Sequence, residues 1–97
     1  MEWITFVKRE NARKAEEILR HDFDLAAKQS ITIKDAKTLG FKEEGSYFYI
    51  KGSDEGVNKC KELIKDFAQD TKEAENVKRK IQEEEESAAA GMGGIFG

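Results

Sequence analysis

The sequence predicts an α+β fold: a two-layer sandwich in which two helices pack on one face of a three-stranded sheet, the second helix being long and C-terminal. Two observations carry this prediction. Segments rich in aromatic and β-branched residues alternate with segments of helical periodicity, in the order β-α-β-β-α. A chain of 97 residues also has room for one compact core and a tail.

The first strand and the first helix follow each other closely. Residues 2–7 (EWITFV) have the aromatic and β-branched composition of a strand. In the next segment apolar residues recur at helical spacing, which gives the helix one apolar stripe. These residues are Ala12, Ala15, Ile18 and Leu19. Asn11 can cap the helix by accepting a hydrogen bond from an unpaired backbone N–H. We expect the helix to end between His21 and Ala27.

A turn and two strands come next. Ile31 and Ile33 alternate with polar residues in the run SITIK, which is the period-two pattern of a half-buried strand. Asp35 can cap a single helical turn, and Gly40 can end that turn with a positive φ. Residues 46–51 (SYFYIK) form the third predicted strand. Its side chains alternate between Phe48 and Ile50 on one face and Tyr47, Tyr49 and Lys51 on the other.

The last predicted element is a long helix from Asp54 to about Glu84, with Ser53 as its cap. Its apolar residues are concentrated in the first half, and few remain beyond Thr71. Those few are Ala74, Val77 and Ile81. The second half of the helix is therefore expected to project past the domain, to pair with another chain, or to fray.

The composition divides the chain into three regions. We expect a compact α+β domain over residues 1–70 and an acidic extension of the C-terminal helix over 71–86, which contains four consecutive glutamates at 83–86. Residues 87–97 hold four of the eight glycines. Gly-rich sequence loses much conformational entropy on ordering, so we expect this segment to be a flexible tail.

The overall composition excludes several classes of protein. Hydrophobic and charged residues each make up 38% of the chain, and the net charge is −3. No run approaches the ~20 apolar residues of a membrane-spanning helix, and a single Cys excludes a disulfide framework. The N-terminal residues do not have the pattern of a secretory signal. We therefore expect a cytoplasmic protein, and its Lys and Glu content is typical of heat-adapted organisms.

We find no catalytic motif in the sequence. Cys60 has apolar neighbours on its predicted helix face, which indicates a core residue rather than a reactive thiol. His21, Asp22 and Asp24 offer metal-ligating groups, but neighbouring residues at a helix end diverge, which favours a solvated helix terminus. Phosphate-binding glycine loops are also missing. We therefore expect no catalytic residue, no metal and no cofactor, and the sequence favours a non-enzymatic protein.

One predicted surface could bind single-stranded nucleic acid. If Phe48 and Ile50 face the helices, the opposite face of the sheet carries aromatic and basic side chains. These are Tyr47, Tyr49, Lys34 and Lys51. RNA-binding modules stack bases on such a face. Alternatively, the tyrosines are ordinary strand residues and the loop 35–45 or the tail covers them; the acidic net charge also disfavours phosphate binding.

The tail is the second candidate surface. Met92, Ile95 and Phe96 are isolated apolar residues that follow the acidic segment. Apolar anchors on an acidic arm are typical of short motifs that dock in a partner's groove, whereas the alternative is an inert chain end. We expect a small protein-interaction or adaptor module with a protein partner, and RNA binding as the alternative. The weak apolar seam of the last helix predicts a monomer or a weak dimer.

Three resemblances accompany these predictions. The stretch from Tyr49 to Ile64 resembles the strand–Gly–helix ending of KH domains, although their GxxG loop between two helices is missing here. The element order resembles a ferredoxin-like unit without its last strand. As a whole, the chain is similar to a small α+β protein of methanogenic archaea, through the segments KGSDEGVNKCKELIKDF and GMGGIFG. This resemblance implies an α+β domain and no particular functional residue.

Overall fold

The structure, a computed structural model, describes the backbone of residues 1–96 and the side chains of residues 1–85. Over these residues the chain forms one antiparallel sheet of four strands in the order β2-β3-β1-β4. The strands are β1 (Glu2–Lys8), β2 (Ser30–Asp35), β3 (Gly45–Lys51) and the short β4 (Ala68–Gln69). The predicted α+β class is confirmed, but the sheet has a fourth strand that the sequence did not indicate.

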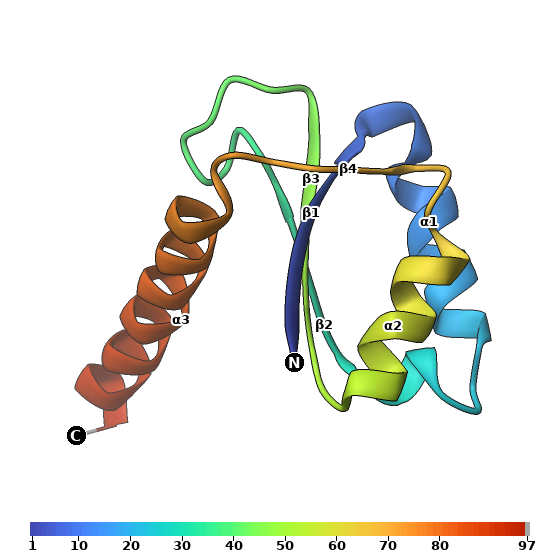
Figure 1. The fold of residues 1–97 in the computed structure, drawn as a ribbon. Coiled ribbons are helices and arrows are strands. Elements are labelled where there is room, and N and C mark those ends of the chain that lie inside the picture. Colours follow the sequence, from blue (N-terminus) through green and yellow to red (C-terminus); the bar gives the residue numbers. More distant parts are fainter. Residues whose placement is uncertain (97) are drawn as a thin grey trace.

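Helices cover both faces of this sheet (Figure 1). Helices α1 (Arg9–His21) and α2 (Asp54–Leu63) lie on one face, together with the 3₁₀ turn η1 (Ala26–Lys28), and helix α3 (Ala74–Phe96) lies on the other. The expected arrangement of two helices on one face is therefore extended by a third layer. No helix in the described part of the chain is long and apolar enough to cross a bilayer.

The prediction of one continuous helix from Asp54 to about Glu84 is wrong. Helix α2 ends at Leu63, and the N–H groups of Phe67 and Ala68 both donate hydrogen bonds to the Ile64 carbonyl in a turn. The chain then pairs with β1 as β4 and passes to the other face of the sheet (Figure 1). A straight helix would leave the second face of the sheet uncovered, whereas the break lets Val77 and Ile81 become fully buried.

The start of α1 also differs from the prediction. The helix begins at Arg9, and Lys8 stands at the cap position without a side-chain hydrogen bond, so Asn11 lies inside the helix rather than at its cap. The reason is that β1 runs into α1 without an intervening loop. The other predicted caps are confirmed. Ser53 accepts a hydrogen bond from the Gly56 N–H at 3.0 Å, and Asp35 accepts one from the Lys37 N–H at 2.9 Å.

The face under α1 and α2 holds an aliphatic core. Its fully buried members come from β1, both helices, η1 and β3. They include Val7, Leu19, Phe48, Ile50, Val57 and Ile64. The strand register aligns Trp3 with Ile50 and Ile50 with Ile31, so these three side chains lie in one row across the sheet.

The face under α3 holds a second core with a different character. Tyr47 and Tyr49 of β3 pack against Val77 and Ile81 of α3. The turn after β2 contributes Ala36 and Leu39, and the rings of Phe6 and Phe41 pack against Tyr47 with centroids 5.4 and 5.2 Å away. Gly40 ends this turn with φ of 90°, as its sequence position indicates.

The side chain of Gln29, the residue directly after η1, fixes the start of α2. The Gln29 amide accepts a hydrogen bond from the Ser53 N–H at 3.1 Å and donates one to the Leu25 carbonyl at 2.9 Å. Gly52 and Gly56 lie against this amide, and a Cβ atom at either position would approach it to within 1.8 and 2.1 Å. A larger residue at either place would move the Gln29 amide aside and break these two hydrogen bonds.

Candidate interaction surfaces

The residues considered for catalysis or metal binding have structural roles. Cys60 is fully buried, with Sγ 4.0 Å from the Ala26 carbonyl oxygen, and burial raises the pKa of its thiol above the ordinary value of 9.0. A thiol with a raised pKa is a poor nucleophile at neutral pH. His21 ends α1, and its ring lies 6.3 Å from that of Phe23. The described residues contain no group of three His, Cys, Asp or Glu side chains that could hold a metal ion.

The structure places the four residues of the predicted nucleic-acid face under or beside α3. Tyr47 and Tyr49 are only 1% and 3% exposed. Lys34 forms an ion pair of 3.0 Å with Glu84 of α3, and Lys51 lies over the Tyr49 ring with Nζ 5.2 Å from its centroid. Bases could stack on these tyrosines only if α3 moved away, because stacking needs an exposed ring face.

Polar contacts attach α3 to β1 across this face. Glu2 accepts hydrogen bonds from the Tyr49 hydroxyl at 2.9 Å and from Lys78 Nζ at 2.7 Å. The hydrogen bond from Lys78 is the main cause that lowers the pKa of Glu2 below its usual 4.5, and the same bond raises the pKa of Lys78 above 10.5. Burial raises the pKa of both Tyr47 and Tyr49 above 10.0.

The third set of predicted residues falls in the tail. The backbone of α3 extends to Phe96, but the side chains of Met92, Ile95 and Phe96 lie outside the described residues. Their predicted role as partner anchors therefore stays a prediction. The acidic side chains that precede them, Glu83, Glu84 and Glu85, are exposed along α3.

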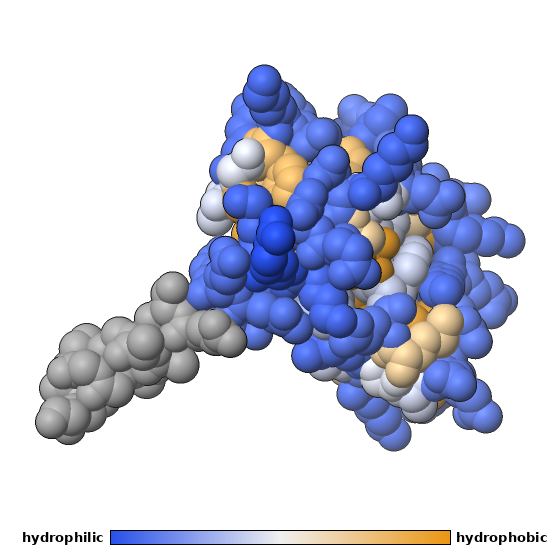
Figure 2. Space-filling view, turned by 60° about the vertical axis from the view of Figure 1, so that its left-hand side comes forward, coloured by the Kyte–Doolittle hydropathy of each residue, from blue (hydrophilic) through white to orange (hydrophobic). Residues whose placement is uncertain are grey.

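The surface shown in Figure 2 is mostly hydrophilic, and apolar residues appear on it only in small separate areas. Two large apolar side chains are exposed by more than a third of their surface among the described residues: Phe23 at 71% and Met1 at 45%. Single exposed apolar residues of this kind are ordinary on folded proteins. A binding site is therefore better sought where apolar surface, a hollow and charged groups coincide.

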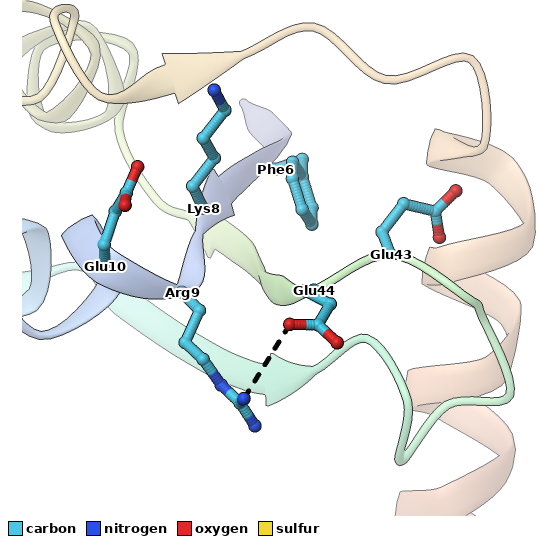
Figure 3. A pocket seen from close by; sticks show the side chains of 6 residues that line it. All are labelled: Phe6, Lys8, Arg9, Glu10, Glu43 and Glu44. Atoms are coloured by element: carbon cyan, nitrogen blue, oxygen red, sulfur yellow. Dashed lines mark ion pairs between the residues drawn. The ribbon is translucent and has the colours of Figure 1, made fainter.

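Such a site lies where β1 runs into α1. A hollow of about 520 Å³ is lined by Phe6 and Lys8 of β1, by Arg9 and Glu10 of α1, and by Glu43 and Glu44 of the segment before β3. We call it the Phe6 hollow. Figure 3 shows the Phe6 ring between Lys8 and Glu43, with the carboxylate of Glu10 on the far side of Lys8. One aromatic ring thus sits among charged side chains of both signs.

The shape of the Phe6 hollow depends on Gly45. A Cβ atom on Gly45 would lie 2.4 Å from the Val7 carbonyl oxygen and 2.5 Å from Cζ of Phe6. Because no real Cβ atom makes contacts this short, any other residue would push the ring or the backbone of β1 aside. The other side of the Phe6 ring packs on Tyr47. Gly45 and Tyr47 together therefore fix the ring in its half-buried position.

The charges around the Phe6 hollow fall into two groups. Glu44 is occupied within the protein: it lies 3.0 Å from Lys37 and 3.9 Å from Arg9, and the hydrogen bond from Lys37 is the main cause that lowers its pKa below 4.5. In contrast, Lys8, Glu10 and Glu43 form no ion pair with any side chain among residues 1–85. All three groups are exposed; Glu43 also lies near the Tyr47 hydroxyl, whereas Lys8 and Glu10 are available to an outside partner.

Sequence reasoning did not identify this site. Its charged residues stand in two segments, KRE at 8–10 and KEE at 42–44, that are far apart in the chain. The antiparallel register between β1 and β3, which pairs Lys8 with Gly45, brings them together. A correct pairing of the first and third strands would have revealed the cluster.

Comparison with protein-family models, with curated proteins and with solved structures finds no match for this chain. The function must therefore be argued from the geometry of its own residues.

Proposed function

We propose that the protein is a small non-enzymatic interaction module that binds another protein at the Phe6 hollow. The observation that carries this proposal is the combination of an aromatic ring with unpaired charges of both signs around one opening. Aromatic anchors surrounded by a polar rim are the usual anatomy of protein–protein contact sites. The opening is framed by long surface side chains, whereas small-molecule sites are deeper and mostly apolar.

The rim also indicates the chemistry of the partner. Glu10 and Glu43 offer carboxylates on either side, and Lys8 offers one ammonium group between them. A partner residue with an apolar stem and a cationic head, such as Lys or Arg, would place its stem on the Phe6 ring and its charge near these carboxylates. A partner carboxylate would pair with Lys8. Charges at a rim contribute more to partner selection and association rate than to affinity.

A charge-exchange variant tests the site. Lys8→Glu combined with Glu43→Lys keeps the net charge but reverses the pattern around the Phe6 hollow. The matched control is Glu62→Lys combined with Lys65→Glu, which makes the same exchange at exposed positions on and just after α2. The wild type and the control should capture the same proteins from a lysate of the source organism. The variant Lys8→Glu with Glu43→Lys should fail to capture them. Equal capture by all three chains would exclude this hollow as the binding site.

The predicted tail anchors can be tested in the same capture. A chain that ends at Glu86 retains the packing of Val77 and Ile81 but lacks Met92, Ile95 and Phe96. Loss of partners from this shorter chain alone would place binding in the tail. An identical set of partners would show that binding does not need the tail.

RNA binding through the sheet face stays the alternative. It would use Tyr47 and Tyr49, and their burial under α3 gives it no support. Titration with random single-stranded RNA at low salt, followed by amide chemical shifts, tests it directly. Shifts on β2 and β3 together with loss of α3 packing are expected if the alternative holds, and the absence of shifts on these strands would exclude it.

A further inference from the structure

The outer edge of β1 is only partly covered by β4. β4 pairs with Phe6 and Val7, and the Gln69 carbonyl at its end accepts a hydrogen bond from the Thr5 hydroxyl at 2.8 Å. Beyond Gln69 the chain turns away toward α3. In Figure 1 β4 crosses the upper part of β1, and the lower part carries no strand on this side. The edge is therefore open over residues 2–4.

The hydrogen-bond pattern shows which backbone groups point to this edge. Met1 and Gly52 exchange both of their N–H···O bonds, at 2.9 and 3.1 Å, and the Arg9 N–H donates to the Glu44 carbonyl. Bonded pairs alternate along an antiparallel ladder, so the odd-numbered residues of β1 direct their N–H and C=O groups to β3. Glu2 and Ile4 direct theirs outward, where no strand in the described part of the chain pairs with them.

A hollow lies beside these outward groups. It measures about 160 Å³ and is lined by Glu2, Trp3 and Ile4 of β1 and by Ala74, Glu75 and Lys78 of α3. Trp3 and Ile4 point to opposite faces of the sheet, because neighbouring side chains of a strand alternate. The hollow touches both residues, as expected for a space beside the part of the β1 edge that β4 leaves unpaired.

We propose that this edge binds an extended segment of a partner protein by strand addition, which continues the position of β4 along β1. The backbone groups of Glu2 and Ile4 offer up to four main-chain hydrogen bonds to such a segment. The inference deepens the proposed function, on which it rests for the existence of a protein partner, and it places the contact on a second surface.

The residues around this hollow determine which side chains of a bound segment it accepts. Toward α3, Ile4 and Ala74 present an apolar surface to the hollow, which has room for one aliphatic side chain. Glu2 and Lys78 neutralise each other at 2.7 Å. Glu75 is exposed and forms no ion pair within residues 1–85. We therefore expect a β-branched or aliphatic residue in the hollow and a Lys or Arg nearby that meets Glu75.

The same walls disfavour a second copy of this chain. On one side α3 reaches the edge through Ala74 and Lys78, and on the other Lys61 of α2 lies over the Trp3 ring with Nζ 5.8 Å from its centroid. An added strand would lie about 4.8 Å from β1, on the side between these helices. A second copy would have to bring its own flanking helices into the space beside these residues, whereas a single extended segment brings none.

A random heptapeptide display library, selected on the full chain, tests the proposal. We expect enriched sequences with alternating β-branched or aliphatic residues and at least one basic residue. Binding is followed through Trp3, the only Trp of the chain, and through the amide signals of Glu2 and Ile4. A selected peptide is then N-methylated on alternate residues in each of the two registers. Methylation in one register should weaken binding at least about tenfold, and in the other no more than about twofold.

A pair of protein variants provides the second measurement. Ala74→Trp fills the hollow and should weaken the peptide at least about tenfold, whereas Asn76→Trp, at an exposed position of the same helix, should leave binding within about twofold. Circular dichroism checks that both variants fold. The methylation test uses the unaltered protein and decides the matter if Ala74→Trp does not fold.

Three outcomes would overturn the proposal: no enriched sequence, equal sensitivity to methylation in both registers, or undiminished binding to folded Ala74→Trp. The variant Lys8→Glu with Glu43→Lys should bind the selected peptides normally, because neither residue lines the hollow beside Glu2 and Ile4. If this variant loses them, the peptides bind the Phe6 hollow and not the edge. If the peptides bind the edge but no lysate protein depends on the Phe6 hollow, the Phe6 hollow is excluded as a binding site and the edge of β1 is retained.

Discussion

The two faces of the sheet are covered by different means. Under α1 and α2 the buried residues are almost all aliphatic, and they come from many elements of the chain. Under α3 the core is smaller, contains both tyrosines, and is bordered by the contacts of Glu2 with Lys78 and of Lys34 with Glu84. Apolar burial varies little with pH, whereas tyrosines and ion pairs titrate. We therefore expect the α3 face to be more sensitive to pH than the face under α1 and α2.

The largest expected effect comes from the aliphatic face. Leu19→Ala removes a fully buried side chain of α1 and leaves a cavity in the larger core. We expect it to lower the free energy of unfolding by about 2–5 kcal/mol and to destabilise both faces together. Denaturant unfolding followed by circular dichroism measures this change. Loss of α3 packing with an intact α1/α2 core would contradict the difference between the faces.

A smaller and more local effect is expected on the α3 face. Ile81→Ala should cost about 2 kcal/mol, because α3 rests on few buried side chains and can detach without the rest of the domain. Amide hydrogen exchange should accelerate in α3 and over Tyr47 and Tyr49. Protection in α1 and α2 should be kept. Equal acceleration throughout the chain would show that the two faces unfold as one unit.

Alkaline pH should destabilise the α3 face more than the α1/α2 face, without any substitution. Folding raises the pKa of Tyr47 and Tyr49 above 10.0, so their contribution to stability is complete below pH 10 and is lost as the pH rises through the raised values. Because the chain has only two tyrosines, absorbance of the phenolate reports on this face alone. We expect both to titrate above pH 10, together with loss of α3 packing. Ordinary titration with α3 in place would contradict this prediction.

The smallest effect is expected at the ion pair between α3 and β2. Glu84→Gln removes the ion pair with Lys34, and both side chains are partly exposed. Pairs of this kind contribute at most about 1 kcal/mol, and salt screens them. The melting temperature should therefore change little and the difference should vanish at high salt. A loss as large as that of Ile81→Ala would mean that ion pairing, rather than apolar burial, holds α3.

Local patterns predicted the elements well and their spatial arrangement poorly. The strands over β1, β2 and β3, the caps Ser53 and Asp35, and the core role of Cys60 all depend on neighbouring residues. The break after Leu63 depends instead on a distant partner, because Ala68 pairs with Val7. Periodicity alone fits one helix across this break, since Ile64, Phe67, Ala74 and Ile81 are separated by three, seven and seven residues, which places them on one helix face.

The same limit explains the outcome for the sites. The alternation in SYFYIK correctly placed the tyrosines opposite Phe48 and Ile50. The sequence did not determine whether that face is covered, and the segments expected to cover it were the loop 35–45 or the tail. The turn residues Ala36 and Leu39 do contribute, but the main cover is α3. The Phe6 hollow and the open edge of β1 depend on strand order and register, which local composition does not encode.

The contact of Gln29 with Gly52 and Gly56 has a consequence for how this chain can change. A methyl group at either glycine would displace the Gln29 amide and break its hydrogen bonds with the Ser53 N–H and the Leu25 carbonyl. With Gln29→Ala the obstruction is removed, and Gly56→Ala would then add a better helix former inside the first turn of α2. The effects of substitution at these positions should therefore be non-additive, because Gly56→Ala costs these two hydrogen bonds only while Gln29 is present.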